Sequence, residues 1–184
     1  MNIVYGGSFN PPTIAHEAII CELKKIYRPE NLIILPTGNS YNRKDLIDFK
    51  YRYEMLKLIS NDIISDYENN NKNYKGTLNA VNYFSNNYND LYFVMGADNL
   101  IQIKTWIRYE ELLDKYHFII ITRDDIDVLK FINDEIPGYK NRFSFIKLKY
   151  DVSSSNIRKN IEDNKDMLNL KVYEYIKKNH LYEV

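Results

Sequence analysis

The sequence predicts an α/β fold, with a doubly wound, mostly parallel sheet that carries helices on both faces. Apolar runs of strand length alternate with segments of helical spacing, and polar or Gly- and Pro-containing loops separate them. The alternation runs along the chain without an internal repeat, which is typical of parallel strands joined by crossover helices. Ligands of such sheets bind beyond the carboxyl ends of the strands, so we expect the functional residues there.

The first part of the chain is expected to form a strand, a loop, a helix and a second strand. Asn2 to Tyr5 has the composition of a short buried strand, and the loop Gly6 to Pro12 leads into a helix from about Thr13 to Tyr27. The apolar run Asn31 to Pro36 predicts the next strand, and a polar loop follows it through Lys44.

The rest of the chain continues this alternation, so the architecture is expected to be Rossmann-like. We expect a helix near Tyr51 to Ile59, a polar loop at Glu68 to Tyr74, a helix near Thr77 to Tyr88, a strand ending at Gly96, helices around Asn99 to Tyr116, a strand at His117 to Thr122, a strand near Phe143 to Leu148, and C-terminal helices after Ser153 to Ser155.

Length and composition restrict the class of protein. The 184 residues suit one domain that spans residues 1–184, and the residues define no oligomeric state. The 25 basic and 25 acidic residues balance, so no overall field favours nucleic acid or an anionic membrane as a partner. The longest apolar runs are strand-sized, no secretion signal is evident, and Cys21 is the only cysteine. We therefore expect a cytoplasmic protein that binds any anion locally.

The segment GGSFNPPTIAH, Gly6 to His16, is the first candidate site. Its glycines let the backbone turn and approach a ligand, and the following helix presents unpaired amides and the positive end of its dipole. Thr13 and His16, three residues apart, are expected on one side of the first turn, which predicts a phosphate pocket. The glycine spacing matches neither GxGxxG nor a Walker A loop. In the alternative interpretation Thr13 caps the helix and His16 is a half-buried packing residue.

The segment VSSSNIRK, Val152 to Lys159, is the second candidate phosphate site. Hydroxyls at Ser153 to Ser155 open a helix, and Arg158 adds a planar, permanently charged guanidinium group. The alternative interpretation is a serine-rich helix cap followed by an exposed arginine.

Together these motifs resemble the nicotinate-nucleotide adenylyltransferase family, within the nucleotidyltransferases that carry a [HT]xGH motif and an ISSTxIR-like motif. Here the two motifs read TIAH and VSSSNIR. GADNLIQIKTW, Gly96 to Trp106, resembles the family's GADxL segment with its downstream tryptophan, and VYEYIKKNHLY resembles its C-terminal helix. The resemblance covers nearly the whole chain, and three ordered motifs at fitting distances are specific.

The resemblance implies roles for residues of both motifs. Thr13 and His16 would hold the ATP phosphates, Arg158 and Ser153 to Ser155 would hold the β and γ phosphates, and Gly96 with Asp98 would hold the adenosine ribose. A carboxylate at a strand end also suits sugar hydroxyls on physical grounds, while a helix N-cap is the alternative for Asp98. Four more positions in the motifs would bind ATP: Gly7, Ser8, Phe9 and Ile157.

The resemblance also points to residues outside the two motifs. Lys44 resembles the family's basic position after the second strand, where it would reach the phosphates, and a solvated loop lysine is the alternative. Thr77 and Trp106 would surround the nicotinate, although a lone tryptophan can simply belong to the core. Arg52 and Arg123 could assist with the phosphates. Packing or surface roles are expected for the remaining residues of reactive type: His117, Cys21 and His180.

Four positions depart from the family's usual pattern. Ala15 replaces the glycine of the [HT]xGH motif, and Asn10 stands where an aspartate is common. Ser155 keeps the hydroxyl of the usual threonine, and Asn169 appears where a proline often precedes the last helix. Neither of the first two changes removes a phosphate donor, and the change at Asn169 concerns the packing of the last helix.

The implied reaction is adenylyl transfer from ATP to nicotinate mononucleotide, giving deamido-NAD (nicotinate adenine dinucleotide) and pyrophosphate in NAD biosynthesis. A phosphate monoester has its second pKa at about 6, so the acceptor can attack the α-phosphorus in line without a general base. Mg²⁺ is expected to arrive with ATP and to have no cluster of protein ligands, because neither phosphate motif contains several carboxylates.

Other functions stay open at this point. The alternatives are adenylyl transfer to phosphopantetheine or to nicotinamide mononucleotide, and a non-catalytic nucleotide sensor. A tRNA-charging enzyme is disfavoured, because the chain has neither a tRNA-binding module nor a basic face.

Overall fold

The fold is built on a six-stranded sheet in the order β3-β2-β1-β4-β5-β6, in a computed structural model that describes residues 1–40, 45–71, 75–122, 126–148 and 152–183. All five pairs of neighbouring strands are parallel. The strands are β1 Asn2–Gly7, β2 Asn31–Pro36, β3 Ile63–Ile64, β4 Leu91–Gly96, β5 His117–Thr122 and β6 Phe143–Lys147. The predicted α/β class with a parallel sheet is confirmed.

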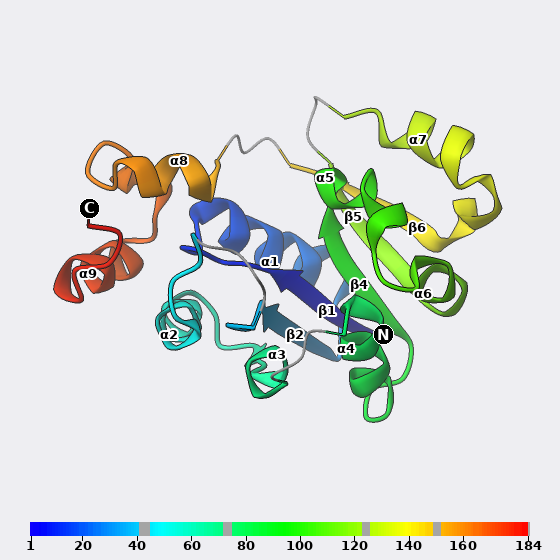
Figure 1. Ribbon diagram of the computed structural model, residues 1–184, viewed down its shortest axis with the longest axis horizontal. Coiled ribbons are helices and arrows are strands. Elements are labelled where there is room, and N and C mark those ends of the chain that lie inside the picture. The colour runs from blue at the N-terminus through cyan, green and yellow to red at the C-terminus, as the bar shows by residue number, and fades with distance from the viewer. Residues whose placement is uncertain (41–44, 72–74, 123–125, 149–151, 184) are drawn as a thin grey trace.

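Helices connect these strands and pack on both faces of the sheet (Figure 1). They are α1 Ile14–Tyr27, α2 Phe49–Ile59, α3 Tyr67–Asn70, α4 Thr77–Ser85, α5 Ala97–Leu100, α6 Tyr109–Lys115, α7 Val128–Glu135, α8 Ser154–Lys159 and α9 Leu170–Lys178, with 3-10 turns η1 Ile103–Thr105, η2 Pro137–Arg142 and η3 Lys165–Met167.

The alternation of side chains along β1 explains the two covered faces. Ile3 and Tyr5 point to one face and join a buried cluster with Ile20 and Leu23 of α1. Val4 points to the other face, where α4, α6 and α7 pack against the sheet. Both faces are therefore buried, as expected for parallel strands.

The strand order reverses between β1 and β4, and this reversal marks where a ligand can bind. The connections from β1 and β4 leave in opposite directions across the sheet, so their carboxyl ends flank a crevice. At the other end of β1 an amide pair joins the first residues of neighbouring strands: Asn31 Nδ2 donates to Asn2 Oδ1 at 2.8 Å. Asn2 and Asn31 are also paired in register.

A third buried cluster joins the C-terminal part of the chain to the start of α1. It contains Ala15, Met55 of α2, Ile157 of α8 and Val172 of α9. This packing brings the second motif and the C-terminal residues beside the first motif, although more than a hundred positions separate them in the sequence.

Two expectations about the elements were wrong, and two elements were not expected at all. Gly6 and Gly7 belong to β1 instead of to the loop, because both pair in register with β2. The segment expected as a polar loop from Glu68 contains the short helix α3, while its residues 72–74 lie outside the described part. The sequence also predicted neither β3 nor α7, since β3 has only two residues and α7 shows only Val128 and Ile132 as a buried face.

Candidate active site

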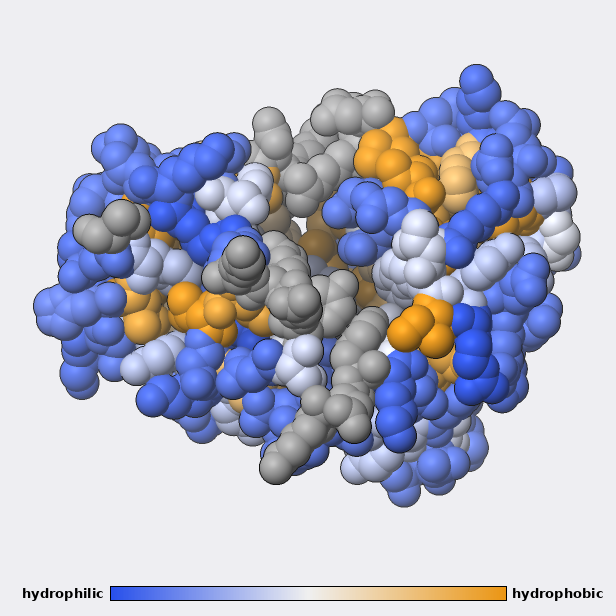
Figure 2. Space-filling model, viewed as in Figure 1, coloured by the Kyte–Doolittle hydropathy of each residue, from blue (hydrophilic) through white to orange (hydrophobic). Residues whose placement is uncertain are grey.

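A cleft of about 680 Å³ opens at the carboxyl ends of β1, β2 and β4. Figure 2 shows this face of the molecule hollowed near its centre, close to where β1 and β4 end in Figure 1. The cleft is lined by residues from both sides of the strand-order reversal, among them Gly6, Gly7, Ser8, His16, Thr37, Glu68, Thr77, Gly96, Asp98, Trp106, Ser153 and Ser154.

The loop after β1 is held from beneath by an aromatic side chain. Phe9 is fully buried, and its φ of 47° lies in the left-handed region that non-glycine residues seldom adopt. The Phe9 ring packs edge-on against the Tyr5 ring, with 5.3 Å between the ring centroids. Its centroid lies 5.0 Å from that of the His16 ring. Such a strained backbone persists only where the surroundings fix it, so the buried ring anchors the loop and supports the imidazole.

His16 is oriented by the residue that caps α1. The Thr13 backbone N–H donates to His16 Nδ1 at 2.9 Å, and the Thr13 hydroxyl also lies 2.9 Å from that nitrogen. A backbone N–H can only donate, so Nδ1 is the acceptor and the neutral ring carries its proton on Nε2. Thr13 itself is only 1% exposed and does not line the cleft, whereas His16 does.

The structure shows the capping interaction of the first motif, and the phosphate pocket stays a prediction. Thr13 is the N-cap of α1, as in the packing interpretation. His16 is half-buried but also presents an edge of its ring to the cleft. The capping interaction is what fixes the imidazole there.

Arg52 holds the same loop from the side of α2. Its guanidinium is completely buried, and it donates to the carbonyl oxygens of Ser8 at 3.0 Å and Ile47 at 2.9 Å. These contacts fix the backbone of the loop after β1, and Arg52 is not a lining residue of the cleft. Arg123, the other arginine considered for the phosphates, lies outside the described residues, as does Lys44.

The second motif is divided between the cleft and the protein interior. Ser153 and Ser154 line the cleft, and the Ser154 hydroxyl donates to the Pro11 carbonyl at 3.0 Å. Ile157 is buried. Arg158 donates to the Asn10 carbonyl at 2.8 Å, to the Ser155 hydroxyl at 3.3 Å, and to the Asp45 carboxylate. Neither Ser155 nor Arg158 lines the cleft; Arg158 contacts Ser155 and holds Asn10 of the loop after β1.

The end of β4 presents a carboxylate to the cleft. Gly96 is the N-cap of α5, so Asp98 is not the N-cap, and the Asp98 side chain turns back over Gly96. A Cβ atom on residue 96 would lie 2.3 Å from Asp98 Oδ1, so the carboxylate can take this position only over a glycine. Within the described part of the chain the Asp98 carboxylate has no hydrogen-bond or ion-pair partner. It is therefore available to a ligand.

Thr77 and Trp106 face the same cleft from the opposite side. Thr77 is the first residue of α4, after Gly76 with a φ of 85°. Trp106 packs edge-to-face on Phe93 at 6.4 Å and also lines the cleft, so it belongs to the core and to the site at once. Gly76 lies against Ile107, where a Cβ atom would be 3.0 Å from the Ile107 Cβ. This close approach holds the segments of Thr77 and Trp106 together.

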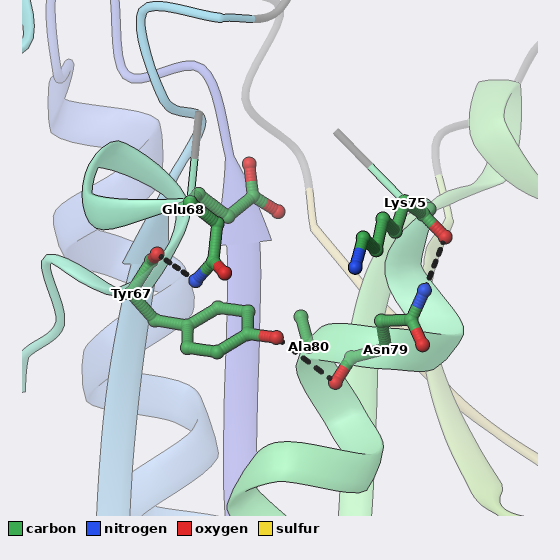
Figure 3. A pocket seen from close by; sticks show the side chains of 7 residues that line it. Tyr67, Glu68, Lys75, Asn79 and Ala80 are labelled. Carbon is green, nitrogen blue, oxygen red and sulfur yellow. Dashed lines mark hydrogen bonds between the residues drawn. The ribbon is translucent and has the colours of Figure 1, made fainter. Parts of the chain in front are cut away.

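Glu68 lies between the large cleft and a small neighbouring pocket of about 20 Å³, which has room for one water molecule (Figure 3). The Gly38 backbone N–H donates to Glu68 Oε2 at 3.2 Å. Burial raises the pKa of the Glu68 carboxyl, and the Gly38 N–H and the charge of Arg52 oppose that rise. In Figure 3 the Tyr67 ring extends from α3 to α4, where its hydroxyl donates to the Asn79 carbonyl at 3.3 Å.

Sequence reasoning missed several lining residues. Glu68 fell in an expected loop, and its chemistry gave no local signal. Asn99, Gln102 and Thr105 also line the cleft, together with Asp98. The spacing of 98, 102 and 105 is that of one face of a helix, and this pattern could have identified them, although the chain here forms α5, a turn and η1.

The residues assigned to packing or the surface lie away from the cleft. The His117 ring stacks on Tyr92 at 5.2 Å, Cys21 is exposed on α1, and His180 is exposed beside Glu183. Among the described residues no group of three or more His, Cys, Asp or Glu side chains could hold a metal ion. No helix of the described chain is long and apolar enough to cross a membrane.

Comparison with known proteins first defines the class. A model of the cytidylyltransferase-like family matches residues 4–160, which include both motifs up to Lys159. Solved structures of nicotinic acid mononucleotide adenylyltransferase from Plasmodium falciparum share the fold. The complex with NaAD has a TM-score of 0.79 at 26% identity over 98% of this chain and 96% of that one. The complex with APC has a TM-score of 0.77 at 28% identity, over the same shares of both chains.

Curated relatives then specify the family. The protein of Acholeplasma laidlawii, described as a probable nicotinate-nucleotide adenylyltransferase, is 43% identical over 100% of this chain and 98% of its own. The protein of Caldicellulosiruptor saccharolyticus with the same description is 34% identical over 98% and 97% of the two chains. The chain belongs to the nicotinate-nucleotide adenylyltransferase family.

Proposed function

We propose that this protein transfers the adenylyl group of ATP to nicotinate mononucleotide, giving nicotinate adenine dinucleotide and pyrophosphate in NAD biosynthesis. The observation that carries the proposal is one cleft lined by three parts of the chain. They are the loop after β1 at residues 8–13, which we call the phosphate loop, the end of β4 at Gly96 and Asp98, and the pair Thr77 and Trp106. The relatives named for this reaction, and the similar structures holding NaAD and APC, support the same assignment.

The phosphate loop and the start of α8 are proposed to bind the triphosphate. The His16 Nε2–H would donate to it, and Gly7, Ser8, Ser153 and Ser154 line the same part of the cleft. Thr13 and Phe9 are proposed to act through His16. Thr13 is too buried to contact a ligand, and the buried Phe9 ring packs against the imidazole. Asp98, turned over Gly96, is the proposed acceptor for the ribose hydroxyls.

Arg158, Ser155 and Ile157 are proposed to support the β and γ phosphates from behind the loop. A guanidinium group has five N–H donors, and the contacts to Asn10, Asp45 and Ser155 occupy three. We propose that the guanidinium acts on the phosphates through the loop backbone that it holds at Asn10. Lys44, which directly precedes Asp45 in the chain, is proposed as a further phosphate-binding residue on the family resemblance alone.

The acceptor is proposed to lie between Thr77 and Trp106, with its pyridine ring against the indole. Its 5′-phosphate is already largely dianionic near neutral pH, so it can attack the α-phosphorus without a general base. The protein then has to align the two polyanions and stabilise the charge that develops on pyrophosphate. His16 is positioned for the second task.

Mg²⁺ is proposed to accompany ATP. The described residues contain no three-residue cluster of metal-binding type. Of the two carboxylates that line the cleft, Glu68 accepts a hydrogen bond from the Gly38 N–H, and Asp98 is proposed to bind the ribose. These residues suit an ion that is bound mainly by the ATP phosphates, which we place beside His16 and Ser153. When bound, the ion neutralises phosphate charge.

One domain and a cytoplasmic location are part of the proposal. The cleft is lined by residues from Tyr5 to Ser154, and residues of α9 pack with α2 and α8 in one buried cluster, which supports a single domain. The lone cysteine supports a reducing compartment.

The test is pyrophosphate release from ATP and Mg²⁺ with nicotinate mononucleotide, nicotinamide mononucleotide and phosphopantetheine supplied separately. We expect release chiefly with nicotinate mononucleotide. Preference for another acceptor would change the substrate. Absence of release with all three, in folded protein that still binds ATP, would reject the enzyme in favour of a nucleotide sensor.

A further inference from the structure

Asn10 connects the phosphate loop to three other parts of the chain, two through its side chain and one through its backbone carbonyl. Its Nδ2 donates to the Asp45 carbonyl at 2.7 Å. Its Oδ1 accepts from the Tyr182 hydroxyl at 2.9 Å and from the Ile47 N–H at 3.4 Å. Its backbone carbonyl accepts from Arg158. Asn10 is completely buried and is not a lining residue of the cleft, so it acts on its neighbours and not on a ligand.

The orientation of the Asn10 amide is fixed by backbone groups. The Asp45 carbonyl can only accept and must face Nδ2, while the Ile47 N–H can only donate and must face Oδ1. The Tyr182 hydroxyl therefore donates to Oδ1. An aspartate at position 10 would lack the donor that Asp45 requires, which accounts for an asparagine where the family resemblance leads one to expect a carboxylate.

Tyr182 reaches this network from the far end of the chain. It follows α9, lies 172 positions from Asn10, and packs against the cluster of α2, α8 and α9. Burial raises the pKa of the Tyr182 hydroxyl, an effect that the charges of Arg158 and Arg52 partly oppose. The hydroxyl therefore keeps its proton at neutral pH and remains a donor.

We infer that Tyr182 and Asn10 are positioning residues for adenylyl transfer, through which the C-terminal segment fixes the phosphate loop against residues 45–47. Resting on the proposed function, this inference assigns to the C-terminal tyrosine a part in a site that it does not touch. The consequence is a link between four segments: the loop after β1, the turn before α2, α8 at Arg158, and the C-terminus.

The perturbation is Tyr182→Phe, which removes the hydroxyl and keeps the ring. Tyr173→Phe is the matched control, because the Tyr173 hydroxyl also belongs to the C-terminal region but donates to Glu162 at 2.8 Å, outside the network. Asn10→Ala and the Tyr182→Phe/Asn10→Ala pair complete a double-mutant cycle in the full chain.

For Tyr182→Phe we expect kcat to fall about tenfold. KM for ATP and KM for the acceptor should stay within about twofold of wild type, because a displaced loop misaligns donors that are needed mainly in the transition state. In the Asn10→Ala background the same change should have no further effect on kcat. Hydrogen–deuterium exchange of the Ile47 amide should accelerate in Tyr182→Phe and remain unchanged in Tyr173→Phe.

The inference is overturned if Tyr182→Phe has the same kcat as Tyr173→Phe, if the two effects in the cycle add, or if exchange at Ile47 is unchanged. A wild-type protein without turnover on any acceptor would instead reject the proposed function. In that case the exchange comparison still decides whether Tyr182 fixes the loop.

Discussion

Replacing Gly96 by alanine should weaken the binding of ATP without disturbing the backbone. The residue has φ −74° and ψ 159°, a conformation that alanine adopts freely, so no backbone strain is introduced. The added Cβ would lie 2.3 Å from Asp98 Oδ1, and since atoms cannot approach so closely, the carboxylate must turn away from its present position.

The size of the effect follows from the contacts that Asp98 would lose. Each hydrogen bond between a ribose hydroxyl and a carboxylate contributes about 1.5–3 kcal/mol. Loss of one such bond corresponds to about a ten- to hundredfold increase in KM for ATP. Steady-state pyrophosphate release at varied ATP measures this value, with the acceptor held at saturation.

Gly138→Ala is the matched control, because a Cβ atom at residue 138 meets nothing within 4 Å. Asp98→Ala in the Gly96→Ala background should add little to the loss, since both changes remove the same contacts. An unchanged KM for ATP in Gly96→Ala, or additive effects of the two changes, would refute the assignment of Asp98 to the ribose.

Three further predictions concern the loop and its supports. His16→Ala should lower kcat by about a hundredfold in a protein with an unchanged circular dichroism spectrum, because a donor to the developing charge is lost; wild-type turnover would remove His16 from the mechanism. Arg52→Met should lower the free energy of unfolding in urea by about 3 kcal/mol or more, since the Ser8 and Ile47 carbonyls lose their donor and Glu68 loses a neighbouring positive charge; a loss below about 1 kcal/mol would contradict the role given to it. The raised pKa of Glu68 means that the folded state binds this proton more tightly than the unfolded state. As pH rises from 4.5 through the folded-state pKa, the free energy of unfolding of wild type should therefore fall relative to that of Glu68→Gln. Urea unfolding across a pH series gives the sign, and an opposite trend would mean that Arg52 outweighs burial.

The sheet was largely predictable from local pattern. The runs Asn31–Pro36 and His117–Thr122 form β2 and β5 with those bounds, because consecutive apolar residues in a buried parallel strand leave a strong signal. The helix α7 was missed because only two of its eight residues are buried, and Ile, Asn and Lys are abundant throughout the chain. The pair Ile63–Ile64 is too short for any periodicity to show.

The site was predictable where it depends on strand ends. Ser8, His16, Gly96 and Ser153 were singled out separately and line one cleft, since parallel strands bring their carboxyl ends to one edge. The supports behind the loop had no such signal. Nothing local in the sequence indicates that Phe9 takes a positive φ or that Arg158 turns toward Asn10, because both depend on contacts formed only after the chain has folded.

The hydrogen bond between the Asn2 and Asn31 side chains fixes the relative alignment of β1 and β2 at their amino ends, opposite the cleft. The two strands rise together at about 3.3 Å per residue, so their alignment at the first residues decides how far Gly7 and Pro36 project at the last. A slip of one residue would shift the phosphate loop by that rise and reverse the face of every side chain in the strand. Residues remote from any ligand therefore determine how far the loop extends. A substitution at Asn2 or Asn31 that changed the register would alter the positions of the residues in the cleft.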